Sequence, residues 1–335
     1  MSPALEALLL PFSKGGLTVP KRILFLGAEL HPDLKAWPDV TGWQPHKGLA
    51  MNWENAGFKR VDEPIGTWPL VMMLPGKSKD ETLAQFAQGY DLLEDGGILL
   101  ASMTNLGGAE RFEKELKKAA GAVESFQKHK CRVFHAVKSA AWDHELLAKW
   151  REAGKIRVIP NTTFLVQPGL FSPDHLDPGS KLLVEHLPNS LRGAVADLGG
   201  GWGYLTRWVA DHCPNVKRLD LHEVDFRAIT LARENLKGSP VEVAFHWHDV
   251  SKGLPHTYDA VVMNPPFHSG QNTDIDLGVA FVKTASASLK QGGRLYLVAN
   301  RKLPYERHLD AAQLTWRKVA EDGTYKILFA ERTLK

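Results

Sequence analysis

The residues with the clearest chemical meaning lie in the second half of the 335-residue chain, where polar side chains follow apolar segments. The first motif is Asp197-Leu-Gly-Gly-Gly-Trp-Gly203, which comes after the apolar segment 193–197 and before a helical segment. Glycines at such a place let the backbone turn sharply and approach a ligand closely. Loops of this kind occur in dinucleotide, flavin and S-adenosylmethionine (SAM) sites and also in plain tight turns, so further residues must decide.

Acidic residues end the next two predicted strands. Glu223 ends the segment RLDLHE, about 20 residues beyond the glycines, where a carboxylate can accept both ribose hydroxyls of an adenosine. Asp249 follows the third strand, where it could accept the adenine amino group. Each acid alone is typical of a solvated strand end. Ligands of open α/β sheets bind at the carboxyl ends of strands, so three suitable ends in succession predict an adenosine site.

The run Asn264-Pro265-Pro266-Phe267 follows the fourth apolar segment, 258–263. Proline fixes its own backbone and pushes the preceding residue toward extended geometry, so this loop should hold the Asn264 amide in one place. The amide oxygen and a neighbouring carbonyl can accept hydrogen bonds from an exocyclic NH2 group, and Phe267 can stack on the ring that bears it. The motif therefore predicts a planar amine as the acceptor.

These three features together resemble the class I SAM-dependent methyltransferases that act on planar amines. The segments Pro168-Gly-Leu-Phe-Ser172, Val298-Ala-Asn300 and Leu303-Pro-Tyr305 narrow the resemblance to ribosomal RNA guanine-N2 methyltransferases of the RsmC/RlmG type. That family has two tandem methyltransferase-like domains, so the resemblance covers nearly the whole chain, more strongly over 156–335 than over 1–155. It implies methyl transfer from SAM to the N2 amine of a guanine in ribosomal RNA, free or in a ribosomal subunit.

The resemblance also assigns roles to individual residues of this chain. The SAM loop would be formed by Asp197, Gly199, Gly201 and Gly203. Glu223 would hold the ribose, and Asp249 would lie at the adenine. The methionine end of the cofactor would be closed over by Phe171, Asp177, Gly179 and Ser180. The flipped guanine would be held by Asn264, Pro265, Pro266 and Phe267.

The elements that position these residues follow an α/β plan. Strand patterns at 193–197, 216–222, 241–247, 258–263 and 294–299 alternate with helical patterns at 205–212, 226–236 and 278–289. The first half repeats this rhythm with strands at 22–27, 68–74 and 98–102 and helices at 79–93 and 110–120. We therefore expect two tandem Rossmann-like methyltransferase domains: a degenerate one over 1–155, for substrate recognition or support, and a catalytic one over 156–335.

Composition excludes several classes of protein. Apolar residues make up 44% of the chain and charged residues 24%, as in ordinary globular proteins. A net charge of +3 excludes a polycationic tail protein but not a local basic patch. Such a patch, next to the predicted site, would contact RNA through Arg301, Lys302 and Arg307. No run approaches the ~18 apolar residues of a membrane span, and we expect a cytoplasmic protein.

Metal sites and disulfides are not expected. The two cysteines, Cys131 and Cys213, cannot make a disulfide framework or a four-ligand zinc site. His246 and His248 would lie on one face of an extended segment, but no third ligand stands at a useful spacing.

Other functions stay open at this point. Loops of the Asn-Pro-Pro-aromatic type also serve methylation of adenine N6 and of protein glutamine amides. A protein that kept the fold and lost the activity could instead be an RNA-binding ribosome assembly factor. Transfer of labelled methyl groups separates an enzyme from a binder, and mapping of the modified group separates the acceptors.

Overall fold

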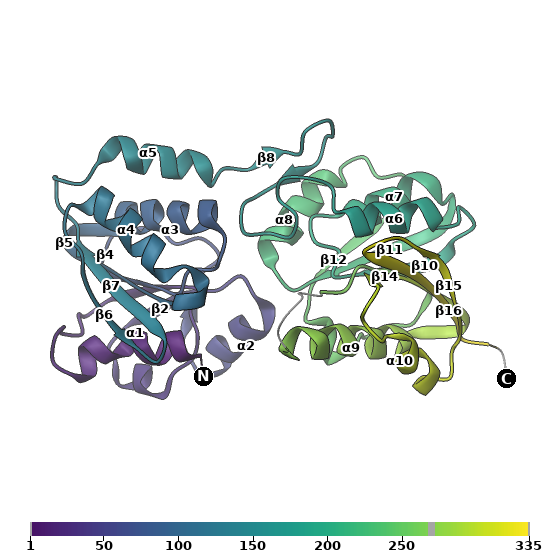
Figure 1. Ribbon diagram of the computed structural model, residues 1–335, viewed down its shortest axis with the longest axis horizontal. Helices are drawn as coiled ribbons and strands as arrows, with labels where there is room; N and C mark the ends of the chain where they lie inside the picture. The colour runs from purple at the N-terminus through teal and green to yellow at the C-terminus, as the bar shows by residue number, and fades with distance from the viewer. Residues whose placement is uncertain (1, 267–271, 334–335) are drawn as a thin grey trace. The chain divides into compact units, whose positions relative to one another are not determined.

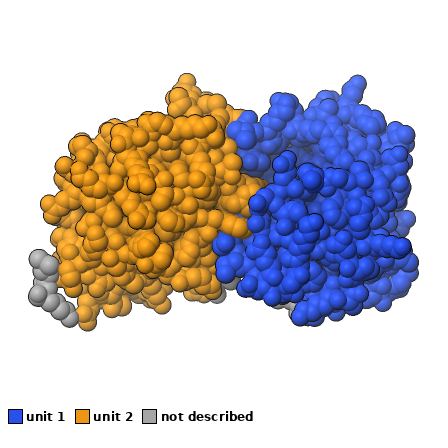
Figure 2. All heavy atoms as spheres, turned by 180° about the vertical axis from the view of Figure 1, so that it is seen from behind, with its two compact units in different colours: residues 1–156, 167–169 blue, residues 157–166, 170–335 orange. Residues whose placement is uncertain are grey.

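The computed structural model describes residues 2–266 and 272–333. It divides into two compact units, one of Met1–Ile156 with Gln167–Gly169 and the other of Arg157–Val166 with Leu170–Lys335, which Figure 2 shows in different colours. No helix among the described residues is long and apolar enough to cross a membrane.

The second unit is built on a seven-stranded sheet in the order β12-β11-β10-β13-β14-β16-β15. The strands are β10 (Arg192–Leu198), β11 (Asn215–Glu223), β12 (Val243–Trp247), β13 (Tyr258–Met263), β14 (Leu289–Asn300), β15 (Thr315–Glu321) and β16 (Tyr325–Glu331). The first five pair in parallel, and β16 runs antiparallel to both β14 and β15. The carboxyl ends of β10, β11, β12 and β13 therefore meet at one edge of the sheet.

Helices cover both faces of this sheet. They are α6 (Pro178–His186), α7 (Tyr204–His212), α8 (Phe226–Asn235), α9 (Asn272–Ala287) and α10 (Glu306–Ala311), with a short 3-10 turn at Val250–Lys252. Alternate residues of the central strands face opposite cores. Val195 and Ala260 pack with α6 and α7, whereas Ala196 and Val261 pack with α9 and α10. A two-stranded hairpin of β8 (Arg157–Val158) and β9 (Leu165–Val166) precedes α6.

The first unit has a seven-stranded sheet with the same plan, in the order β3-β2-β1-β4-β5-β7-β6. Its strands are β1 (Ile23–Leu26), β2 (Val40–Trp43), β3 (Lys59–Arg60), β4 (Trp68–Met73), β5 (Leu93–Thr104), β6 (Glu124–Lys128) and β7 (Cys131–Val137). One core holds α3 (Lys79–Leu92), α4 (Ala109–Ala120) and α5 (His144–Ala153). The opposite core holds α1 (Pro3–Ser13) and α2 (Lys47–Asn55) (Figure 1).

The predicted fold class is confirmed, with one local difference that both units share. The strands predicted at 98–102 and 294–299 begin just after the pairs Gly96-Gly97 and Gly292-Gly293, which would then be turns before each strand. Instead they lie inside the twelve-residue strands β5 and β14. Gly96 and Gly292 adopt positive φ angles of 79° and 72°, and the strand pairing shifts register beside each pair. These glycines therefore form bulges that bend the strand without ending it.

Candidate active site

The glycine loop after β10 turns back toward the end of β11. Gly199, Gly201 and Gly203 have φ angles of 71°, 54° and 98°, in the left-handed region that favours glycine. The N–H of Gly199 donates to the carbonyl of His222 over 2.8 Å, which ties the start of the loop to β11. The loop ends where α7 begins, with Gly203 as the N-cap residue. Backbone N–H groups at such a helix start form a site for anionic groups.

Asp197 lies at the end of β10 and is 1% exposed. Its Oδ2 accepts a hydrogen bond of 2.6 Å from the Thr206 hydroxyl, while its Oδ1 has no partner among the described residues. Burial raises the pKa of Asp197 from 3.8 to about 7, and the charge of Glu223 acts in the same direction. A buried acceptor oxygen with no donor suits a cationic or hydrogen-bonding ligand group.

The Glu223 carboxylate holds the backbone around it. Its Oε2 accepts from the N–H of Gly201 over 2.9 Å, and its Oε1 accepts from Val224 and Asp225 over 2.8 and 3.0 Å. Burial raises the pKa of Glu223, against the lowering effect of these backbone donors. A carboxylate oxygen can accept two hydrogen bonds, so Oε2 keeps room for one more donor. The sequence indicated a ligand-facing acid here but not its role in fixing the glycine loop.

Asp249 is held through its side chain, whereas Phe171 is held through its backbone. Asp249 caps the short turn that begins at Val250, because its Oδ1 accepts from the N–H and the hydroxyl of Ser251. Phe171 is 53% exposed, and its carbonyl accepts a hydrogen bond of 2.9 Å from Nε1 of Trp202.

Trp202 explains why a bulky residue stands inside the glycine loop. It is 4% exposed and packs in a small apolar cluster with Ile159, Val166 and Leu170 from the segment before α6. Its ring lies 5.1 Å from that of Phe164. The indole therefore fixes the segment that carries Phe171 to the loop that follows Asp197.

Asn264 follows the last residue of β13, and its amide is held by two acceptors. Nδ2 donates to Oδ2 of Asp177 and to Oγ of Ser180, both over 2.8 Å. Oδ1 is buried and has no partner among the described residues. Of the rest of this motif, Pro265 and Pro266 are described, whereas Phe267 lies outside the described residues.

Asp177 and Ser180 belong to the first turn of α6. Asp177 is the N-cap residue, since its Oδ2 accepts from the N–H of Ser180 over 2.7 Å, and Pro178 stands at the next position. A Cβ at Gly179 would lie 3.0 Å from the ring of Tyr325, so the turn packs closely against β16. The family resemblance pointed to both Asp177 and Ser180, but not to their contact with Asn264.

The predicted basic cluster lies after the carboxyl end of β14. Arg301, Lys302 and Arg307 are exposed. The Lys302 N–H donates to Oδ1 of Asn300, the last residue of β14. Because β13 and β14 are parallel, this cluster and Asn264 follow strands that end at the same edge of the sheet.

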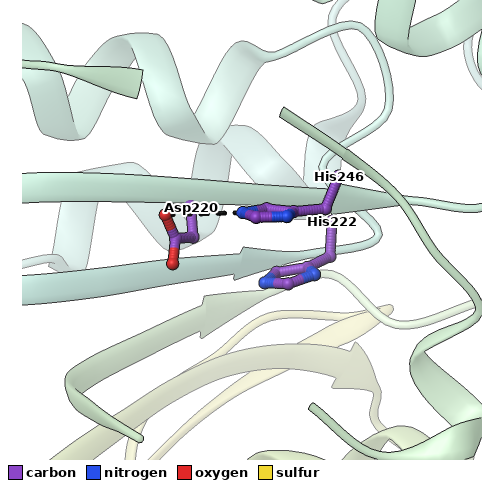
Figure 3. A group of neighbouring side chains, drawn as sticks. All are labelled: Asp220, His222 and His246. Carbon is purple, nitrogen blue, oxygen red and sulfur yellow. Dashed lines mark ion pairs between the residues drawn. The ribbon is translucent and has the colours of Figure 1, made fainter. Parts of the chain in front are cut away.

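A histidine cluster lies on the sheet beside the site (Figure 3). Asp220, His222 and His246 could each offer one ligand atom within 4.8 Å of the others. However, the Tyr258 hydroxyl donates to Oδ2 of Asp220 over 2.8 Å and lies 3.1 Å from Nε2 of His222. Nε of Arg218 donates to Oδ1 of Asp220 over 2.7 Å. The carboxylate thus already has a cation and a hydroxyl as partners.

Ring geometry also argues against a metal ion in this cluster. The rings of His222 and His246 are stacked, 4.4 Å apart and 12° from parallel, so a single ion cannot lie in the plane of both. Burial lowers the pKa of His222 to about 3, which keeps the ring neutral. Nε2 of His248 lies 2.6 Å from the Gly253 carbonyl. Asp220, His222 and Tyr258 thus form a hydrogen-bonded group within the sheet, and His246 stacks on it with Nε2 3.5 Å from Oδ1 of Asp220.

Comparisons with known proteins agree with this arrangement. A family model described as "Methyltransferase small domain" matches residues 161–329, half of the chain. The chain belongs to this family. The methyltransferase class predicted from the sequence is thereby confirmed, and the match falls almost wholly within the second unit.

Relatives and a solved structure extend the likeness over both units. Proteins named "Ribosomal RNA small subunit methyltransferase C" from Yersinia enterocolitica and Salmonella newport are each 28% identical to this chain, over 319 and 323 residues. The matches span 91–92% of this chain and 90–91% of the relatives. A T. thermophilus 16S rRNA N2 G1207 methyltransferase (RsmC), solved with AdoMet and guanosine, has a TM-score of 0.81 at 24% identity. That match covers 99% of this chain and 92% of that one.

Strand register aligns this methyltransferase sheet with the sheet of the first unit. Gly27 donates its N–H to the Trp43 carbonyl over 2.9 Å, as Gly199 does to His222. Leu26, the last residue of β1, pairs with Trp43, and Leu198, the last residue of β10, pairs with His222. The positions of Asp197, Glu223 and Asn264 correspond in the first unit to Phe25, Gln44 and Leu74.

These replacements remove both carboxylates, and the one polar replacement is used within the first unit. Phe25 is fully buried, and Nε2 of Gln44 donates to the Ala28 carbonyl over 2.8 Å. A Cβ at Gly42 would lie 2.5 Å from Nε1 of Trp53, so the indole fills the space beside β2. A 3-10 turn at Pro32–Ala36 stands where the second unit has α7. The first unit thus keeps the sheet but has neither the two carboxylates nor the Asn264 amide at these three positions.

Proposed function

We propose that this methyltransferase transfers a methyl group from SAM to the exocyclic N2 amine of a guanine in the 16S rRNA of the small ribosomal subunit. The observation that carries the proposal is the buried, unpartnered Oδ1 of Asn264, fixed at the end of β13 by two hydrogen bonds on the other side of the amide. The names of the full-length relatives and of the solved structure support the choice of acceptor.

The residues at the strand ends fit SAM. Asp197 offers a buried acceptor oxygen with no donor, which suits the ammonium of an amino acid moiety. The N–H groups of the glycine loop suit its carboxylate, and Glu223 and Asp249 suit the ribose and adenine. In this proposal Gly179 would lie near the methionine end, and Phe171 would cover it. When bound, SAM supplies a methyl group that its sulfonium already activates.

Asn264 and its loop would prepare the acceptor amine. The unpartnered Oδ1 and the Pro265 carbonyl accept hydrogen bonds from the two amine hydrogens, which directs the nitrogen lone pair away from the loop. The same oxygens stabilise the positive charge that develops on the nitrogen during transfer. The surplus proton can leave to solvent afterwards, so the chain needs no strong general base. Pro266 stiffens the loop, and Phe267 would stack on the base.

RNA binding would combine a basic rim with a flipped base. A guanine must leave its stack to reach Asn264, and phosphate contacts from Arg301, Lys302 and Arg307 would hold the strand around it. Catalysis in this proposal belongs to residues 156–335, while residues 1–155 support the fold and add RNA-binding surface. A cytoplasmic location follows from a ribosomal substrate.

Methyl transfer from labelled SAM to purified 30S subunits, 50S subunits and free 16S rRNA tests the proposal. We expect transfer to 16S rRNA, with N2-methylguanine as the product in a nuclease digest. Asn264→Ala should abolish transfer and leave SAM binding nearly intact, whereas Asn215→Ala, at the exposed start of β11, should behave as wild type. N6-methyladenine or methylglutamine as the product would reject guanine as the acceptor. SAM binding without any transfer would favour an assembly factor.

A further inference from the structure

Two side chains of α6 take up both amide hydrogens of Asn264. One hydrogen goes to Oδ2 of Asp177 and the other to Oγ of Ser180, each over 2.8 Å. Asp177 is 9% exposed, Ser180 is 6% exposed, and Asn264 is half-buried. The amide therefore has no donor left, and its free function is the acceptor Oδ1.

The charge of Asp177 decides which way the Asn264 amide points. An ionised carboxylate only accepts hydrogen bonds, so the amide atom that faces Asp177 must be the NH2 group. The opposite rotamer would place two acceptors, Oδ1 and Oδ2, against each other and leave the NH2 group toward the substrate. An NH2 group in that place would repel the hydrogens of an acceptor amine. The first turn of α6 thus sets the orientation of the Asn264 amide that leaves Oδ1 toward the substrate.

The first unit provides an internal comparison for this contact. Helix α1 packs on β5 and β7 as α6 packs on β14 and β16, and both helices begin with an N-cap residue followed by proline. Ser2, Pro3 and Leu5 stand at the positions of Asp177, Pro178 and Ser180. Ser2 still caps its helix, since its Oγ accepts from the N–H of Leu5.

The residues that contact the amide in the second unit are replaced in the first. Leu74 stands in the first unit where Asn264 stands in the second, and there Leu5 replaces the serine and Ser2 the longer aspartate. A helix cap alone would not require Asp rather than Ser, because both residues cap well. The aspartate and the serine are present where the amide is present and absent where it is not.

We infer that Asp177 and Ser180 are positioning residues that fix the orientation of the Asn264 amide for methyl transfer. This inference rests on the proposed function of Asn264. It replaces the role that family resemblance gave these two residues, which was contact with the methionine end of SAM. The Asp177 carboxylate, which accepts from the NH2 group, also shifts electron density of the amide toward Oδ1. Oδ1 is therefore a stronger hydrogen-bond acceptor where positive charge develops.

Asp177→Ser tests the inference, because serine keeps the helix cap but is too short to reach Asn264. We expect kcat to fall by about 10²-fold, as for other small misplacements of reacting groups. Calorimetry should give unchanged SAM affinity, and the melting temperature should stay close to that of wild type. Asp143→Ser, at the N-cap of α5, is the matched control and should keep full activity. A loss of SAM affinity with kcat unchanged would instead support the cofactor role.

Ser180→Ala removes one of the two acceptors and leaves Asp177 in place. We expect a smaller loss of kcat, roughly tenfold, with SAM affinity again unchanged. Wild-type kcat in this variant would overturn the assignment for Ser180.

An exchange of the two side chains separates direct coupling from a general effect on the fold. Asn264→Asp alone sets two carboxylates against each other and should be nearly inactive. Adding Asp177→Asn restores a donor facing an acceptor, so the double variant should regain activity over the single one. A double variant no more active than Asn264→Asp would contradict the coupling.

All rates in these tests are measured on the acceptor that the wild-type enzyme methylates. If that acceptor is not guanine N2, the proposed function fails, while the kcat pattern still reports on the positioning role. If wild type methylates guanine N2 and the Asp177→Ser variant keeps its kcat, the positioning role alone fails.

Discussion

The N–H of Gly201 donates a hydrogen bond of 2.9 Å to Oε2 of Glu223, which joins the middle of the glycine loop to the end of β11. The other oxygen of the same carboxylate accepts from Val224 and Asp225. One side chain therefore holds three backbone donors, and the shape of the cofactor loop depends on it. The acid that the sequence indicated for the ribose has a structural role as well.

Glu223→Ala should weaken SAM binding by more than loss of a ribose contact alone would. The substitution removes a ligand acceptor and also releases Gly201, so we expect the dissociation constant to rise by at least about tenfold. Isothermal titration calorimetry measures this directly. Glu234→Ala, which removes an exposed ion pair with Lys237, is the control and should bind SAM normally. Unchanged affinity in the Glu223 variant would remove both assignments.

SAM binding should be coupled to the loss of a proton from Asp197. In the free protein, burial raises the pKa of this carboxyl to about 7, so it is largely protonated at pH 6. A cationic ammonium favours the ionised form and lowers that pKa. Affinity should therefore rise as pH increases toward 7 and level off above it.

Proton release can be measured by titrating SAM at pH 6 in buffers of different ionisation enthalpy. The wild-type protein should release a proton, and the released fraction should fall toward zero by pH 8.5. Asp197→Asn should bind more weakly and show no release that depends on this group. Equal proton release by both proteins would assign the proton to another residue.

Trp202 should contribute to stability through packing and through one hydrogen bond. Trp202→Ala should lower the free energy of unfolding by about 3–5 kcal/mol, as for other buried aromatic residues. Trp202→Phe keeps a ring but loses the bond to the Phe171 carbonyl, which should cost about 1 kcal/mol. Urea unfolding followed by circular dichroism measures both. An alanine variant as stable as wild type would contradict the packing role.

The architecture could be predicted because it depends on patterns that local sequence records. The segment 258–263 was expected as a strand and is β13, and the helices at 79–93 and 226–236 were placed within one residue of α3 and α8. The strand predicted at 294–299 started too late, because a glycine pair such as that at 292–293 is typical of a turn as well as of a bulge. Such a pair forms a bulge where the chain on both sides of it pairs with a neighbouring strand, as β14 does with β13, and a turn where it does not. That pairing depends on tertiary structure.

The sequence predicted which polar residues follow the strand ends, but not the hydrogen bonds between them. Strand ends supplied Asp197, Glu223 and Asn264, since parallel strands bring their carboxyl ends to one edge. The bond from Asn264 to Asp177 spans 87 positions and depends on how α6 packs on β14 and β16. A comparison of the two halves could have indicated this bond, because the first half has Ser2 and Leu74 at the positions that correspond to Asp177 and Asn264.

One SAM molecule should bind per chain, despite the two sheets of the same plan. Phe25 and Gln44 stand where the second unit has its two carboxylates, and the indole of Trp53 fills the space beside β2. Calorimetry with SAM should give a stoichiometry of one. Asp197→Asn combined with Glu223→Ala should abolish binding altogether. Residual saturable binding in that variant would place a second cofactor site in the first unit.

Removing the basic rim should weaken RNA binding and leave the chemistry intact. Arg301→Ala with Lys302→Ala removes two charges next to the end of β14, so the KM for RNA should rise several-fold while kcat at saturation stays unchanged. The slope of log KM against log salt should fall by roughly one for each phosphate that the variant no longer neutralises. Lys237→Ala with Lys290→Ala, which removes two ion-paired lysines of the second unit that lie outside the rim, is a charge-matched control for the bulk effect. Equal changes in both double variants would mean that net charge, rather than this rim, sets the affinity for RNA.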